Sequence, residues 1–327
     1  MVLNGKKSGW SEVTSGVVQG SCLGPTLFLI LINTIDNAMD MTTAIISKFA
    51  DDTKAGRVVE NEDDRAKLQE EINNLVAWTE KWQMQFNASK CSIMHLGPKN
   101  PNFSYTMGGH APAGVVLETT VEEKDVGVMI RNDLRPSSQC AKAAKKANSV
   151  LGQMARAFHY RDKDTWPRLY KTYIRCHLEY CVQAWSPYNV ADKELLEKVQ
   201  RRAVGMISGL TGRTYEERLA ECNLTTLEER RTRGDLIQTW KIIHGKDAVD
   251  RSSWFQMTAD EDAVHRTRLA GDQTKLEKPK WKYKLREQFF SVRVVERWNK
   301  LPQDVREAKT INSFKNKYDE WLEKGRP

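Results

Sequence analysis

The sequence lacks any apolar run long enough to cross a membrane. The longest, Leu27–Ile32, has six residues, whereas a bilayer span needs about 20. Cysteine is also scarce, with 6 among 327 residues, which excludes the disulfide framework of small secreted domains and favours a reducing, intracellular compartment. With only 19 Gly and 10 Pro and with 40% hydrophobic residues, neither a collagen-like fibre nor a disordered tail fits. No secretory signal is expected, and the length suits about two globular domains.

The net charge of +8 is concentrated near the carboxyl end. Residues 1–265 hold 34 Lys and Arg and 34 Asp and Glu, whereas residues 266–327 hold 17 and 9. A local excess of cations is typical of proteins that bind nucleic-acid phosphates. A solvated helical surface gives the same composition, so charge alone leaves both interpretations open. No basic helix with a strong apolar face is evident there, which speaks against binding to a membrane surface.

Hydropathy patterns predict an α+β architecture. Apolar residues at 63–86 recur at three- and four-residue steps, as in an amphipathic helix. The residues before it, 45–59, alternate as two short strands around an acidic turn. We expect short antiparallel strands with helices up to residue 135, then mostly helices, with a polar linker at 259–280. The other predicted strands are 92–96, 103–106, 114–117 and 126–130, and the other predicted helices are 138–159, 163–177, 191–208, 215–221, 226–244, 289–298 and 310–323.

The first motif is a glycine-rich loop, Gly16-Val-Val-Gln-Gly-Ser-Cys-Leu-Gly-Pro25. Its glycines let the backbone approach a ligand closely, and Pro25 suits the first turn of a helix. The residues that follow are apolar almost all round, so we expect their helix to be buried. The loop matches neither the dinucleotide-binding nor the P-loop pattern, and by itself it is explained at least as well by a tight turn before a core helix.

The second motif is an acidic pair, Asp51-Asp52, at the turn of the predicted hairpin. Two carboxylates about 5 Å apart at an effective dielectric of about 20 repel by about 3 kcal/mol, which favours recruitment of a cation. Hard ions such as Mg²⁺ bind a few carboxylates together with phosphate oxygens. On a fully solvated turn the repulsion is below about 1 kcal/mol and carries no such meaning. The apolar residues that precede the turn, Ile45, Ile46 and Phe49, favour a hairpin that is packed against other parts of the protein.

Together, the loop, the apolar helix and Phe49-Ala-Asp-Asp52 resemble the palm of reverse transcriptases, in particular those of non-LTR (LINE-type, jockey-like) retrotransposons. Later segments agree in order over essentially the whole chain. Residues 78–97 resemble the next palm helix and strand, and 125–130 resemble the primer-grip hairpin. The resemblance implies four parts: a partial palm at 1–135, a helical thumb and following helical region at 136–258, a linker at 259–280, and a basic helical segment at 281–327.

The resemblance implies an RNA-directed DNA polymerase. We expect it inside the cell, in the nucleus or the cytoplasm and by family analogy in the nucleus, and not on a membrane. It would extend a DNA primer on an RNA template with deoxynucleoside triphosphates, using two Mg²⁺ ions, with Mn²⁺ as a substitute. Asp51 would be the principal metal ligand, with Asp52 in support, and Lys90 would help to neutralise the leaving pyrophosphate. The remaining implied residues are Gln19, Gly20 and Ser21 against the nucleotide and template, and Val126, Gly127 and Val128 at the primer end.

Two groups of cations are candidates for nucleic-acid binding. Near the carboxyl end, Trp281, Tyr283, Phe289 and Phe290 are interleaved with Lys and Arg, a pattern that allows bases to stack while charges track phosphates. The alternative is an ordinary solvated surface. The candidate cations are Lys142, Lys145 and Lys146 on the predicted helix 138–159, and Lys280, Lys282, Lys284 and Arg286 near the carboxyl end.

The sequence also departs from the family pattern. The family has a further metal-binding Asp on an earlier palm strand, and 15 residues precede Gly16. We therefore expect the carboxy-terminal portion of such an enzyme, truncated and with its amino-terminal half missing or supplied by another polypeptide, and little or no polymerase activity from this chain alone. A non-catalytic nucleic-acid-binding remnant is the alternative. A helical protein-interaction module without a nucleic-acid role is a third class.

The remaining chemistry-bearing residues have structural interpretations. We expect Trp166, Trp185, Trp240 and Trp254 to be core or domain-contact residues. Cys176, His177 and Cys181 have no spacing typical of a zinc site, and no arrangement of Ser, His and Asp or of Cys and His is typical of a nucleophilic enzyme.

Overall fold

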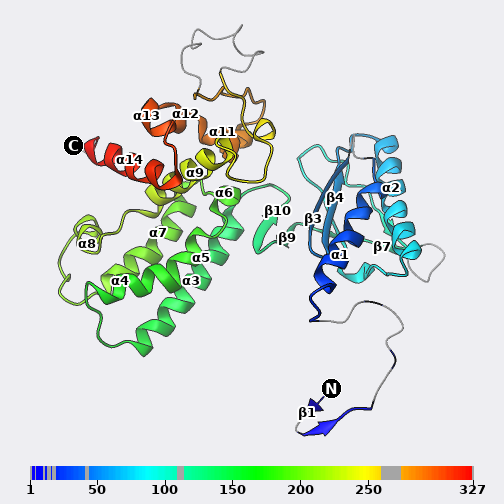
Figure 1. Ribbon diagram of the computed structural model, residues 1–327, viewed down its shortest axis with the longest axis horizontal. Coiled ribbons are helices and arrows are strands. Elements are labelled where there is room, and N and C mark those ends of the chain that lie inside the picture. The colour runs from blue at the N-terminus through cyan, green and yellow to red at the C-terminus, as the bar shows by residue number, and fades with distance from the viewer. Residues whose placement is uncertain are drawn as a thin grey trace. The chain divides into compact units, whose positions relative to one another are not determined.

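The computed structural model describes residues 2–3, 5–9, 12, 16, 20–40, 44–108, 114–258 and 274–325. The chain forms two compact units, Met1–Val126 and Gly127–Pro327 (Figure 1). The first combines short strands with two main helices, and the second is mostly helical. The α+β prediction is confirmed.

A β-hairpin is the largest sheet element of the first unit. Strands β3 (Ala44–Phe49) and β4 (Asp52–Arg57) pair antiparallel, with Phe49 opposite Asp52. Side chains of β3 alternate between the two faces, so that Ala44 is buried while Ile45 is 73% and Phe49 62% exposed. The expectation of a hairpin packed on its apolar approach is therefore wrong for one face. The described residues cover only the side that carries Ala44 and Ile46.

Helix α1 (Gly24–Asn33) begins after the glycine-rich loop with proline in its first turn, as expected. Its inner face, including Ile32, packs against the 3₁₀ helix η1 (Thr34–Ala38). Its outer face is open, with Leu27 49% and Ile30 63% exposed. The prediction that this helix is buried is wrong, because the described residues supply a packing partner on one face only.

Helix α2 (Glu62–Lys81) closes the inner side of the hairpin (Figure 1). Asn61 caps its first turn by accepting a hydrogen bond from the Asp64 backbone. Leu75 and Trp78 lie in one core with Ala44 and η1, and Trp78 Nε1 donates to Thr34 Oγ1 at 3.0 Å. The helix ends before the predicted residue 86, and Gln83 has a φ of 54°, which no helix continues through.

The other strands of the first unit are short. β5 (Ser92–Met94) and β8 (Glu118–Thr120) pair in parallel, unlike the antiparallel pairing we expected for all the strands. A parallel pair needs a long connection, and residues 95–117 provide it. β6 (Thr106–Met107) pairs with β7 (Val115–Val116), and near the amino end β1 (Val2–Leu3) pairs with β2 (Lys6–Lys7).

The chain passes into the second unit through a two-residue turn between β9 (Glu122–Asp125) and β10 (Val128–Arg131). Val126 has a φ of 42° and Gly127 a φ of 88°. Positive φ at both central residues is the type I′ conformation favoured in hairpins.

A bundle of helices follows (Figure 1). Helix α3 (Ser137–Ala157) buries small and apolar residues at helical spacing, including Cys140, Ala144 and Leu151, and these lie in the same core as residues of α7 (Val190–Gly205). The predicted helix 163–177 is instead α4 (Thr165–Leu169), a π-helical turn η3 (Tyr170–Ile174) and α5 (Arg175–Glu179). The short helices α6 (Val182–Trp185) and α8 (Tyr215–Glu221) complete this part.

A second core lies around α9 (Leu227–Ile243). Trp240 and Trp298 are fully buried, as is Phe314 of α14 (Ile311–Lys324). The core tryptophans were predicted correctly except for Trp254, which is 44% exposed. The remaining elements here are η4 (Arg251–Ser253), η5 (Lys284–Gln288), α11 (Phe290–Arg293), α12 (Val295–Asn299) and α13 (Gln303–Arg306).

All six cysteines are free thiols. Burial raises the pKa of Cys140 to about 12, so this thiol is protonated at neutral pH. The described residues contain no group of three or more His, Cys, Asp or Glu arranged to hold a metal ion. No helix among them is long and apolar enough to span a membrane.

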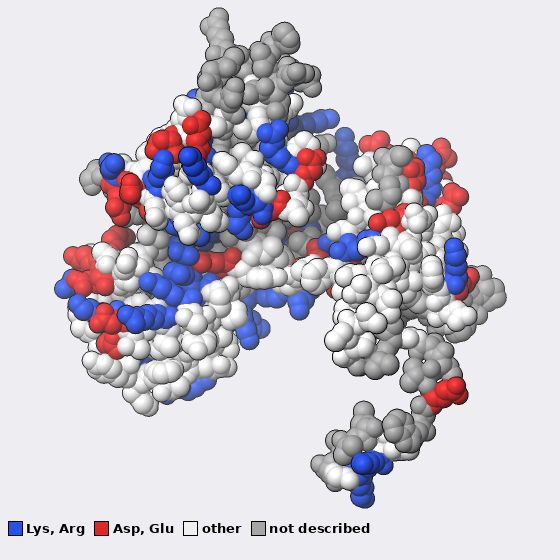
Figure 2. All heavy atoms as spheres, in the orientation of Figure 1, with Lys and Arg blue, Asp and Glu red and all other residues white. Residues whose placement is uncertain are grey.

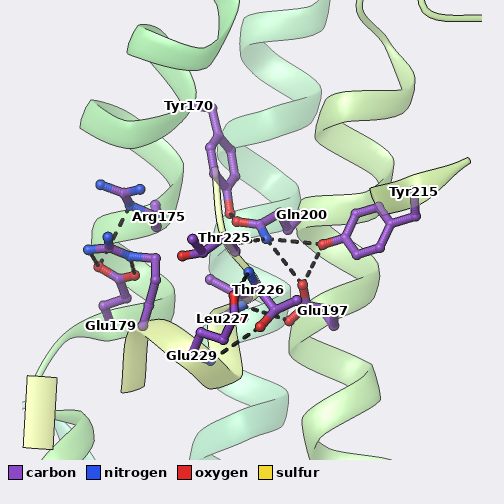
Figure 3. A network of polar contacts seen from close by, with 11 residues as sticks. Tyr170, Arg175, Glu179, Glu197, Gln200, Tyr215, Thr225, Thr226, Leu227 and Glu229 are labelled. Atoms are coloured by element: carbon purple, nitrogen blue, oxygen red, sulfur yellow. Dashed lines mark hydrogen bonds and ion pairs between the residues drawn. The ribbon is translucent and has the colours of Figure 1, made fainter. Parts of the chain in front are cut away.

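A buried amide connects the helices of the bundle (Figure 3). Gln200 is 0% exposed, and its Oε1 accepts a hydrogen bond from the Tyr170 hydroxyl at 2.8 Å. Its Nε2 lies 3.0 Å from both the Tyr215 hydroxyl and the Thr225 carbonyl. Glu197 accepts from the Tyr215 hydroxyl and, at 3.0 Å, from the Leu227 backbone. The network thereby joins η3, α7, α8 and the start of α9.

Replacing Gln200 with leucine is expected to lower the free energy of unfolding by about 3 kcal/mol, because several buried polar groups lose their partners. Urea unfolding followed by circular dichroism measures this. Gln303→Leu is the matched control, since Gln303 is exposed and bonds only Glu307. Equal midpoints for the two variants would contradict the role assigned to the network.

Candidate functional site

The acidic pair lies at the tip of the β3–β4 hairpin. Ala50 has a φ of 53°, Asp51 occupies the turn and Asp52 is the first residue of β4. Both carboxylates are exposed, and neither makes a hydrogen bond or ion pair within the described part of the chain. All four carboxylate oxygens are therefore free for a ligand.

The donor set fits a hard divalent cation in part. Asp51 and Asp52 offer adjacent carboxylate oxygens, the ligands that Mg²⁺ accepts while it keeps several waters. Their mutual repulsion is small at this solvated tip, so the protein gains little by neutralising them there. Within the described ranges no third His, Cys, Asp or Glu joins the pair.

Ion pairs hold the sides and base of the hairpin. Lys48 of β3 contacts Asp36 of η1 at 2.7 Å. At the base, Arg57 contacts Glu71 of α2 at 2.9 Å, and both side chains are buried, 8% and 7% exposed. Burial raises the pKa of Glu71, and the Arg57 guanidinium opposes this rise.

A further ion pair connects the hairpin with the predicted primer grip. Lys54 Nζ contacts a carboxylate oxygen of Asp125, the residue before the Val126–Gly127 turn. Sequence reasoning did not pair Lys54 with Asp125, because no periodic pattern links two residues 71 positions apart.

The glycine-rich loop is described in part. Gln19, which we expected against the nucleotide, lies outside the described residues. Gly20 has a φ of 85°, and no atom lies within 4 Å of the position a Cβ would take. Ser21 has a structural contact, because its Oγ accepts a hydrogen bond from the Gly24 backbone at 3.0 Å at the start of α1.

Lys90 lies at the end of the 3₁₀ turn η2 (Ala88–Lys90), directly before β5. Its side chain is exposed and makes no ion pair with any described residue. It remains available to an anion, although no described contact places it against Asp51.

The turn at Val126 and Gly127 is fixed from the second unit's own residues. The Lys142 ammonium of α3 donates to the Gly127 carbonyl at 2.8 Å. A Cβ at Gly127 would lie 3.3 Å from Cε1 of Tyr180. Lys142 therefore has a structural contact here, whereas Lys145 and Lys146 of the same helix are exposed. Val128, at the start of β10, is 4% exposed and belongs to the core.

The basic carboxy-terminal candidates are exposed. Lys282 lies 5.8 Å from the ring centre of Tyr283, and Arg286 lies 4.9 Å from that of Phe289. Lys280 and Lys284 are exposed as well. Phe290 does not serve as a stacking surface, because it is 6% exposed and packs in the core. On the visible face of the second unit, Lys and Arg alternate with Asp and Glu and form no single patch (Figure 2).

Comparison with known proteins bears on this arrangement. Residues 1–111 match the reverse transcriptase (RNA-dependent DNA polymerase) family. The RNA-directed DNA polymerase from mobile element jockey of Drosophila funebris is 27% identical over 235 residues, 68% of this chain and 25% of the relative. Its counterpart in Drosophila melanogaster is 25% identical over 222 residues, 63% of this chain and 23% of the relative. The chain is similar to jockey-type reverse transcriptases.

The resemblance inferred from the sequence is thus confirmed. The family match contains both the glycine-rich loop and the acidic pair. An alignment of 235 residues is longer than the first unit, so the similarity to the jockey polymerases extends into the helical unit. The chain spans about a quarter of the length of these relatives. No solved structure matches it.

The turn at Val126 and Gly127 is expected to be sensitive to a single added methyl group. Gly127→Ala is expected to lower the free energy of unfolding by about 1–2 kcal/mol, because alanine disfavours a positive φ and its Cβ presses on Tyr180. Thermal unfolding measures the change.

Gly152→Ala is the control. It lies inside α3, where an added Cβ would meet only an arginine tip at 3.9 Å, so alanine should stabilise the helix by about 0.5–1 kcal/mol. Shifts of the same sign in the two variants would count against a constrained turn.

Proposed function

We propose that this chain is part of an RNA-directed DNA polymerase of a jockey-like retrotransposon. It would bind an RNA template and a DNA primer and direct deoxynucleoside triphosphates to the primer end. The observation that carries this proposal is an unengaged pair of carboxylates at a hairpin tip, within the segment that matches reverse transcriptases. The ion pair of Lys54 with Asp125 supports it, since it connects this hairpin to the strand before the proposed primer grip.

Asp51 and Asp52 are proposed to hold divalent metal, Mg²⁺ or in its place Mn²⁺. Bound there, the ions would lower the charge on the triphosphate and activate the primer hydroxyl. The carboxylates contribute free oxygens on a ribbon whose base is fixed by Arg57 and Glu71. Lys90 contributes an exposed positive charge for the pyrophosphate, and Gln19, Gly20 and Ser21 would border the nucleotide.

The primer end is assigned to the turn at Val126 and Gly127, which Val128 of the implied primer grip anchors from the core. Val126 is exposed at this turn, and Lys142 of α3 holds the Gly127 carbonyl. Lys145 and Lys146, exposed on that helix, are suited to the phosphates of a template–primer duplex. Lys280, Lys282, Lys284 and Arg286 provide a further basic track.

The metal site needs at least one more acidic group. A two-stranded ribbon is marginal by itself, and the apolar side chains of Ile45 and Phe49 are exposed. We propose that a further palm strand of the polymerase, carrying the third carboxylate, packs on this open side. Covering it would exclude water and strengthen the interaction of the carboxylates with metal.

A second candidate function is nucleic-acid binding without catalysis. The exposed lysines of α3 and of the carboxy-terminal segment favour it, because phosphate binding needs no metal. It predicts RNA binding that weakens as salt rises and that does not change when Asp51 is replaced.

Metal binding is the first test. Mn²⁺ titration followed by electron paramagnetic resonance should show weak binding that Asp51→Asn/Asp52→Asn reduces about tenfold or more. Asp63→Asn/Asp64→Asn is the control, since it removes another adjacent Asp pair of the same unit, at the start of α2. Equal loss in both variants would reject the assignment of the metal to the hairpin tip.

Binding and extension on a primed RNA template are the second test. Lys145→Gln/Lys146→Gln should lower the slope of log affinity against log salt by about 2, one for each phosphate contact, and Lys309→Gln/Lys315→Gln should leave it unchanged. Little or no primer extension is expected from the chain alone, with Mg²⁺ or Mn²⁺, because the acidic pair has no third described ligand. Robust extension that Asp51→Asn abolishes would show that the site is already complete.

A further inference from the structure

A polar cavity of about 330 Å³ lies within the second unit. It is lined by the first turns of α7 and α9, by residues 186–188, and by the segment from 278 to 300. This is the lower end of the volume range of small-molecule pockets. Six of its lining residues are cations: Lys193, Arg231, Lys278, Arg293, Arg297 and Lys300.

Three of these six cations already have counter-ions. Lys193 contacts Glu228 at 2.6 Å, Lys278 contacts Glu296, and Arg293 contacts Asp235 at 2.9 Å. The other three, Arg231, Arg297 and Lys300, make no ion pair with any described residue. Of the lining carboxylates, only Glu287 is likewise unpaired. The unpaired charge facing the cavity is therefore positive.

Arg231 is the unusual member of this set. It is 4% exposed, and neither Nη1 nor Nη2 has a hydrogen-bond partner among the described residues. Burial lowers the pKa of Arg231 from its ordinary value. Glu197, Glu228 and Glu179 oppose this lowering by their charge, but buried nitrogens without a hydrogen-bond acceptor are costly, and native proteins seldom retain them without a functional reason.

The shape of these groups indicates the ligand chemistry. The planar fork of arginine bonds two oxygens of one phosphate at a time. Trp281 lines the same cavity with Lys278 5.0 Å from its ring centre, and aromatic rings beside cations are typical of sites that stack a base next to its phosphate. The similarity to RNA-directed polymerases makes a nucleic-acid phosphate the fitting anion.

We propose that this cavity binds a backbone phosphate of single-stranded RNA through Arg231, Arg297 and Lys300, with the adjoining base against Trp281. The proposal rests on the proposed function and adds a strand contact separate from the acidic pair. Glu287 weakens the site by its charge and tunes the affinity.

The test uses fluorescence anisotropy of a labelled single-stranded RNA of about 12 nucleotides with the full chain. Arg297→Gln/Lys300→Gln should bind about tenfold more weakly, with the salt slope reduced by about 0.7, since both residues contact the same phosphate of a single strand. Glu287→Gln should bind more tightly. Lys309→Gln, an exposed lysine outside the cavity, is the control. Cavity variants that bind like this control would overturn the proposal.

Arg231→Met separates a binding role from a structural one. If Arg231 is retained for phosphate binding, removing its two buried nitrogens that lack acceptors should raise the unfolding midpoint of the free protein while RNA binding weakens. A lower midpoint together with unchanged RNA affinity would show a structural arginine and overturn the proposal.

The source of the phosphate and the proposed function are tested separately. Inorganic phosphate should compete with the RNA only at far higher concentration than a second RNA strand does. If inorganic phosphate or a glutamate-rich peptide binds the cavity while the RNA affinity ignores Arg297 and Lys300, the site serves another anion and the inference is wrong. Wild-type protein that binds no RNA would reject the proposed function as well. RNA binding that depends on Lys145 and Lys146 but not on the cavity would reject this inference alone.

Discussion

The candidate site depends on the packing that buries one ion pair, Arg57 with Glu71, at the base of the hairpin. A two-stranded ribbon is marginally stable by itself, and the Lys54–Asp125 pair near its tip is exposed enough that solvent screening leaves it little energy. The pair at the base is different, because both side chains are over nine-tenths buried. Burying two charges is costly, so this contact persists only where β4 and α2 are held together by the core around Leu75 and Trp78. The position of Asp51 and Asp52 at the tip therefore depends on how this base is held.

The chemistry of the tip is set by what covers it. Exposed carboxylates at Asp51 and Asp52 neither repel strongly nor attract a cation strongly in a high dielectric. Next to the tip, β3 exposes Ile45 and Phe49 on the face opposite Ala44, and an exposed apolar surface is commonly used for association. A strand that packed on this surface would bury its apolar area and would at the same time lower the effective dielectric around Asp51 and Asp52. Packing and the proposed metal affinity would thus be coupled through a single surface.

Much of the fold and of the candidate site could be predicted from local sequence patterns, and the wrong predictions have one cause in common. The hairpin around the acidic pair, the bounds of α8 and the α+β class follow from hydropathy period and turn chemistry. The open face of α1 and the exposed Phe49 were mispredicted because an apolar side chain looks the same in sequence whether or not a neighbour covers it. The pairing of Lys54 with Asp125, and the convergence of Arg231 with Arg297, depend on tertiary contacts that no period encodes. From the sequence, Phe290 could be either a ring that stacks a base or a core residue. Its packing in the second core shows that it is a core residue.

Two buried polar side chains of the second unit, Gln200 and Arg231, differ in whether their hydrogen-bonding groups have partners. Gln200 is 0% exposed and every polar atom of its amide has a partner, as expected for a group retained because it fixes helices in register. Arg231, also buried, has two nitrogens without one. Sequences that fold to one structure satisfy their interior groups, and exceptions concentrate where a ligand completes them. The contrast occurs within one compact unit, so incomplete folding does not explain it. What Arg231 lacks is a hydrogen-bond acceptor for these two nitrogens, and the cavity beside it has the room and the unpaired charge to hold an anion that would supply one.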